Sequence, residues 1–215
     1  MGCGGATQGP AATPEPTAAP SVATTAPSTP AATAGADAIR WEIVGERSTA
    51  TVRVREQLAT IPAPIDAVIT APASGSFALL PDGTFGEGSA ITVDLTRIAS
   101  DSAQRDRYVR TTSLETGRYP TATFVPTRTE GLALPLPEGA EFTFRLIGDL
   151  TVRAVQREVS FMVTARRDGG ILTATAIADP TWTFAEFGMS VPRAAIVLSV
   201  VDEIRLQIDL VAREA

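Results

Sequence analysis

The chain has 215 residues, enough for one sizeable domain or two small ones, and 44% of them are hydrophobic. Its net charge of −6 argues against binding along nucleic-acid backbones, because such binding needs a basic face. The chain has no histidine, so the usual base of a nucleophilic triad and the usual transition-metal ligand are both missing. We therefore expect no metal, no cofactor and no enzymatic activity.

Residues 1–37 are predicted to be a disordered spacer. They consist almost entirely of Ala, Thr, Pro, Gly and Ser, which cannot bury enough apolar surface to offset the entropy lost on ordering. The single cysteine, Cys3, follows a glycine and precedes this spacer, an arrangement similar to the start of a mature bacterial lipoprotein. A lipid anchor at Cys3 would place the protein outside the cytoplasm, in the cell envelope or periplasm. The alternative is an incidental cysteine in a flexible tail.

Short alternating segments follow from Asp37 onward. A period of two over four to eight residues indicates strands with one buried and one wet face, which is typical of antiparallel sheets. Turn signals such as Pro81-Asp82-Gly83 separate these strands. We predict that residues 38–215 form one all-β domain, an antiparallel barrel of about eight strands. The alternation is clearest at residues 51–55, 91–96, 142–147, 159–163 and 204–210.

One segment, residues 100–119, lacks this alternation and carries helix signals instead. Asp101 with Gln104 resembles a capping box, and Thr112 with Glu115 forms a second one. We predict two short helical turns that cross from one strand to the next. Patterning alone leaves open whether the barrel interior is filled by side chains or encloses a small ligand, since small barrels do either.

Several motifs, taken in order along the chain, resemble those of the YceI-like family. The resemblance covers about residues 38–212. An Arg-Asp pair at 105–106 leads through the crossing to a Tyr-Pro-Thr-x-x-Phe strand at 119–124. A Gly-x-Leu-Thr hairpin begins at Gly148, and weaker landmarks are Phe187-Gly188 and Asp202-Glu203-Ile204. The sequence departs from the family pattern at Tyr108, Arg153, Ala154 and Phe184. These departures weaken the expectation that the polar contacts of the family to the head group of a bound ligand are kept, and leave the apolar lumen unaffected.

The resemblance implies an extended, lipocalin-like barrel that holds a long apolar ligand, and most members of the family are exported. It favours non-enzymatic binding, sequestration or transport of a polyisoprenoid, quinone or other lipid. Two alternatives stay open: a structural or interaction domain on a membrane-anchored stalk with a filled core, and an enzyme acting on a bound quinone or isoprenoid. A homodimer also stays open.

Large apolar residues of the predicted strands and of a segment near the end are candidates for the lumen, with ordinary core packing as the alternative. They are Phe124, Phe142, Phe144, Leu146, Phe161, Val163, Trp182 and Phe184. Three arginines of the crossing, Arg105, Arg107 and Arg110, are candidates for charge-assisted hydrogen bonds to an anionic head group such as a diphosphate. Their alternative role is a solvated face.

Overall fold

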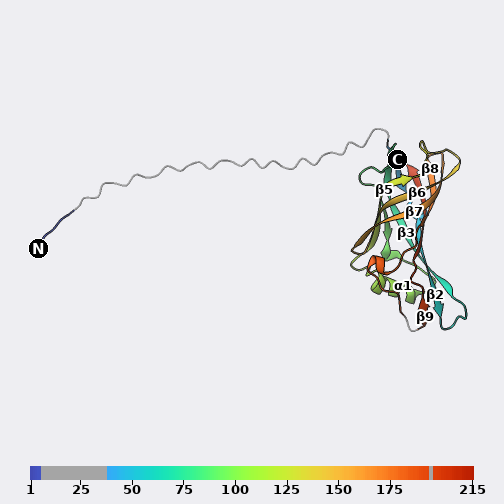
Figure 1. Cartoon of the computed structure of the whole chain (residues 1–215), viewed down its shortest axis with the longest axis horizontal. Coiled ribbons are helices and arrows are strands. Elements are labelled where there is room, and N and C mark those ends of the chain that lie inside the picture. The colour runs from blue at the N-terminus through green and yellow to red at the C-terminus, as the bar shows by residue number, and fades with distance from the viewer. Residues whose placement is uncertain (6–37, 194–195) are drawn as a thin grey trace. The chain divides into compact units, whose positions relative to one another are not determined.

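Ten β-strands form one antiparallel sheet that closes on itself in the computed structural model (Figure 1). The structure describes residues 1–5, 38–193 and 196–215, so most of the predicted spacer lies outside the described residues. The strands are β1 Ile39–Ile43, β2 Thr49–Leu58, β3 Ile65–Leu79, β4 Ala90–Asp94, β5 Thr121–Glu130, β6 Glu141–Val152, β7 Val155–Asp168, β8 Ile171–Ala178, β9 Val197–Val200 and β10 Arg205–Glu214.

The ten strands occupy eight positions around the barrel. From β3 to β8 each strand pairs with the next along the chain, β8 pairs with β10, and the circle closes because β1 and β2 each pair with both β10 and β3. β1 and β2 share one position, since both pair with β3 and with β10. β9 and β10 share another, since both pair with β2, β10 with residues 49–53 and β9 with residues 56–58. The predicted barrel of about eight antiparallel strands is confirmed.

A 3₁₀ turn at Gly45–Arg47 separates β1 from β2. Ser48, which is only 1% exposed, stabilises this interruption. Its hydroxyl donates to the carbonyl of Val44 at 3.0 Å and accepts the backbone N–H of Val211 on β10, also at 3.0 Å. The buried hydroxyl therefore satisfies backbone groups that a continuous strand ladder would otherwise pair.

Alternation along the strands puts apolar side chains into the lumen. On β7, Val159, Phe161, Val163 and Ala165 are buried, whereas Met162 between them is exposed. Pairing between β6 and β7 runs without a shift from Glu141–Arg166 to Val152–Val155. The period of two thus sets which face each residue takes.

The crossing between β4 and β5 contains the α-helix α1, Ala103–Tyr108, which continues directly as a π-helical turn over Val109–Ser113. Ser102 caps α1 by accepting the N–H of Arg105 at 3.3 Å, so the predicted cap at Asp101 is wrong. The carboxylate of Asp101 instead pairs with the Arg105 guanidinium. The second predicted start at Thr112 is also wrong, because this residue lies inside the π-helical turn. None of the helices in the described residues has the length and hydropathy to cross a membrane.

Candidate functional site in the barrel lumen

The lumen contains a cavity of about 450 Å³, which lies within the range of about 300–1,000 Å³ typical of small-molecule sites. We call it the larger cavity. Its wall is mostly aliphatic and aromatic, and β2, β3, β9, α1 and the segment 182–192 contribute to it. Four lining residues are exposed, so the cavity reaches the surface. These are Ile61, Asp101, Gln104 and Ile196.

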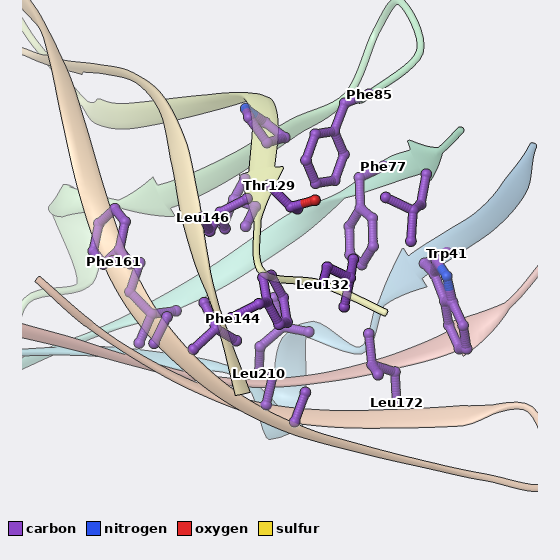
Figure 2. A pocket seen from close by; sticks show the side chains of 18 of the residues that line it. Trp41, Phe77, Phe85, Thr129, Leu132, Phe144, Leu146, Phe161, Leu172 and Leu210 are labelled. Atoms are coloured by element: carbon purple, nitrogen blue, oxygen red, sulfur yellow. The ribbon is translucent and has the colours of Figure 1, made fainter. Parts of the chain in front are cut away.

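A second cavity, of about 80 Å³, lies elsewhere in the lumen and is called the smaller cavity (Figure 2). Trp41, Phe77, Phe144 and Phe161 surround it, and its lining is apolar apart from Thr129. Phe142 and Phe144 lie stacked with ring centroids 6.1 Å apart. Side chains therefore nearly fill this part of the barrel.

Four aromatic rings, which we call the aromatic row, stand between the two cavities. Phe124 contacts Phe161 at 5.2 Å between centroids, Phe161 contacts Trp182 at 5.9 Å, and Trp182 contacts Phe187 at 5.3 Å. All three contacts are edge-to-face, the arrangement that aromatic quadrupoles favour. Phe124 lines both cavities, Phe161 only the smaller one, and Trp182 and Phe187 only the larger one. The row lies where the two cavities adjoin, together with Ile91 and Ile208, which also line both.

The segment that carries Trp182, Phe184 and Phe187 is fixed by local hydrogen bonds. Trp182 exchanges two backbone hydrogen bonds with Ile204, at 3.1 and 2.6 Å. The Glu186 carboxylate accepts both the backbone N–H of Thr183, at 2.7 Å, and its hydroxyl, at 3.0 Å. These bonds, mainly the one from the backbone N–H, outweigh partial burial and lower the pKa of Glu186, with help from the charge of Arg157.

Replacing Glu186 with glutamine is expected to lower the melting temperature at pH 7, by an amount that shrinks as the pH falls below the unfolded pKa of this carboxyl. Folding lowers the pKa of this carboxyl, so its ionised form stabilises the fold above the unfolded value of about 4.3. That contribution is lost as the pH falls through the lower folded value. Thermal unfolding of both proteins across this range tests it, with the exposed Glu87→Gln as control. A melting-temperature difference that persists at low pH would contradict the assignment.

The polar part of the larger cavity is an ion-pair cluster at the start of α1. The Arg105 Nη2 lies 2.6 Å from the Glu56 Oε1, and Arg105 also pairs with Asp101. The Glu56 side chain is 8% exposed and that of Arg105 is 16% exposed, so water screens their interaction only weakly. Burial opposes the charge on Arg105, but the hydrogen bonds and charges of Glu56 and Asp101 outweigh it and raise the pKa of Arg105.

The structure distributes the predicted lumen residues over both cavities. Phe124, Trp182 and Phe184 line the larger cavity. The smaller cavity is lined by Phe124, Phe142, Phe144, Leu146, Phe161 and Val163. Of the predicted head-group residues, Arg105 lines the larger cavity, Arg107 is exposed outside its lining, and the Arg110 Nη1 donates to the carbonyl of Ile98 at 2.9 Å.

Sequence reasoning missed the contribution of β2 and β3 to the larger cavity. Ala50, Val52 and Val54 alternate inward along β2, and continuing that alternation by one step reaches Glu56. An acidic residue at an inward position of a strand was the signal that could have located the polar end. Aromatic residues, which mark lumen positions most clearly in a sequence, are absent from this part of the wall, because β2 and β3 line it mostly with aliphatic residues.

An antiparallel barrel with an apolar cavity in its lumen belongs to the class of small barrels whose interior is not filled by side chains. The chain belongs to the YceI-like family, since the model of the YceI-like domain matches residues 41–212. This confirms the resemblance seen in the sequence. No curated protein matches the chain.

Solved structures share the fold at low sequence identity. A polyisoprenoid binding domain from Saccharophagus degradans, implicated in plant cell wall breakdown, matches with a TM-score of 0.60 and 10% identity over 81% of this chain and 98% of that one. BcnA from Burkholderia cenocepacia matches with a TM-score of 0.53 and 16% identity over 79% of this chain and 98% of its own. At these sequence identities, both comparisons show that the fold is shared and nothing more.

Proposed function

We propose that this protein binds one long apolar ligand, such as a polyisoprenoid, a quinone or another lipid, in the larger cavity. The observation that supports this proposal most strongly is the cavity itself. It has a volume of about 450 Å³, its wall is mostly apolar, and it reaches the surface. In this role the protein sequesters or transports its ligand without chemical turnover. The polyisoprenoid-binding description of the Saccharophagus degradans relative supports this class of ligand.

The energetics of burial favour such a ligand. Transfer of apolar groups out of water contributes about 0.8 kcal/mol per methylene. A chain that fills the larger cavity therefore binds through many small contributions and needs no strong polar anchor. A cavity of this size also argues against the alternative of a structural β-domain with a filled core.

Replacing Ala122 with tryptophan is expected to weaken binding of N-phenyl-1-naphthylamine, an uncharged apolar dye, by about 10-fold or more. Ala122 is buried in the wall of the larger cavity, so the added indole would occupy space that the dye needs. Dye titration followed by fluorescence measures the effect, and circular dichroism checks that the barrel remains folded.

The matched control is Val125→Trp on the same strand. Val125 is 43% exposed and lies outside the cavity lining, so dye affinity should stay as in the wild type. If the wild-type protein does not bind the dye, or if a folded Ala122→Trp variant binds it equally well, the proposed function is wrong.

We further propose that the protein acts outside the cytoplasm, held at a membrane by a lipid on Cys3. Support comes from the lipoprotein-like order of Gly2, Cys3 and a Pro/Thr/Ala-rich segment, and from the exposed, free thiol. Expression in a bacterial host should place the protein in the detergent phase of a phase-partition assay. Cys3→Ser should move it to the aqueous phase, and unchanged partitioning would contradict the anchor.

A further inference from the structure

Charged groups line the larger cavity only around the start of α1. In the part of the chain that the structure describes they are Glu56, Asp101 and Arg105. Two carboxylates and one guanidinium leave one excess negative charge. Uncharged polar side chains complete the polar lining, and they are Thr70, Ser102, Gln104, Tyr108 and Ser113.

The positive charge of Arg105 is already compensated. Its Nη2 lies 2.6 Å from Glu56, and its Nη1 pairs with Asp101 and lies 3.5 Å from the hydroxyl of Ser100. A guanidinium has five N–H donors, so donors remain for an uncharged acceptor. An anion, in contrast, would have to compete with two carboxylates for the same cation.

The other arginines of the crossing do not change this balance. Arg107 is exposed and Arg110 donates to the backbone carbonyl of Ile98, and neither lines the larger cavity. Tyr108 does line it, and its hydroxyl accepts the backbone N–H of Arg193 at 3.4 Å. This hydroxyl keeps its own proton to donate.

We propose that the larger cavity selects apolar ligands with an uncharged polar head, such as an alcohol or a quinone, over ligands with a diphosphate or carboxylate head. This rests on the proposed function and names the ligand class of the same site. A neutral oxygen can accept from Arg105 or Tyr108 without disturbing the ion pairs. An anionic head would lose its hydration beside Glu56 and Asp101 and find no uncompensated cation among the described lining residues.

The test is competition between the bound dye N-phenyl-1-naphthylamine and two ligands with the same chain, farnesol and farnesyl diphosphate. Farnesol is expected to displace the dye at a concentration about 10-fold or more below that of the diphosphate at low salt. In a Glu56→Gln, Asp101→Asn double variant the excess charge becomes positive, and the preference should shrink or reverse. The matched control is Glu87→Gln, Glu141→Gln, which removes two exposed carboxylates outside the lining.

The outcomes separate the two proposals. A preference for farnesol that the cavity variant loses and the surface variant keeps supports the head-group selectivity. Equal or tighter binding of the diphosphate to the wild type overturns it and leaves apolar ligand binding intact. A preference that the surface variant loses equally also overturns it, because net charge alone would then be the cause. Failure of dye and both ligands to bind overturns the proposed function, and the selectivity with it.

Discussion

Replacing Gly148 with alanine is expected to lower the free energy of unfolding by about 3 kcal/mol, because the strands leave no room for a Cβ there. A Cβ at this position would lie 2.3 Å from the carbonyl oxygen of Val125 and 2.7 Å from the Phe124 ring. Gly148 on β6 pairs with Pro126, where the pairing of β5 with β6 shifts register. The backbone of β5 and the Phe124 ring therefore both lie close to the Cα of Gly148. Chemical denaturation of both proteins measures the difference.

The control for this substitution is Gly117→Ala. Gly117 has no atom within 4 Å of a Cβ built on it and does not require a left-handed backbone. Its replacement should change the free energy of unfolding by less than about 0.5 kcal/mol. Equal stability of the Gly148 and Gly117 variants would contradict this prediction. It would show that β5 and β6 can move apart to accept a Cβ at position 148.

Replacing Phe124 with alanine is expected to have a similarly large effect on stability and, in addition, to change ligand preference. Phe124 is 2% exposed and belongs to the aromatic row, so its loss should cost about 3–5 kcal/mol. Because its ring lines both cavities, removing it should join them. The variant should then favour longer-chain alcohols, relative to shorter ones, more than the wild type does in dye-displacement assays.

Phe144→Ala is the matched control, since Phe144 is half-buried and lines only the smaller cavity. It should lose less stability and keep the wild-type preference for chain length. Should Phe124→Ala fail to fold, Phe124→Leu provides a milder opening of the same row. A folded variant at position 124 with unchanged chain-length preference would show that the row does not limit the ligand.

The barrel could be predicted because strand alternation is a local property. The inward positions of β7, including Phe161 and Val163, follow directly from a period of two. The break at Gly45–Arg47 could not be predicted in the same way, because it depends on the contact of Ser48 with Val211 of β10, 163 residues further along the chain. Local signals also misplaced the cap of α1, since Asp101 bonds to Arg105 rather than to the helix backbone.

The site was harder to predict than the fold. Alternation tells whether a residue faces inward, but its height along the barrel axis depends on the stagger between strands. Phe142 and Phe144 therefore pointed into the lumen as expected but lie beside the smaller cavity. The larger cavity exists partly because small residues, such as Ala67 and Ala122, stand where bulkier ones would fill it. Small residues at inward positions are common in filled cores as well, so the sequence alone does not mark them as cavity wall.

The short strand β9 is held in the barrel wall by fewer backbone pairings than the long strands are. It shares three paired residues with β2, its only strand partner among the described residues, whereas β6 and β7 share twelve. Val197 and Val200 of this strand line the larger cavity. Local opening requires the least free energy where the fewest backbone hydrogen bonds break. Local opening of the barrel wall is therefore expected first at the β2–β9 pairing, while the longer strand ladders stay paired.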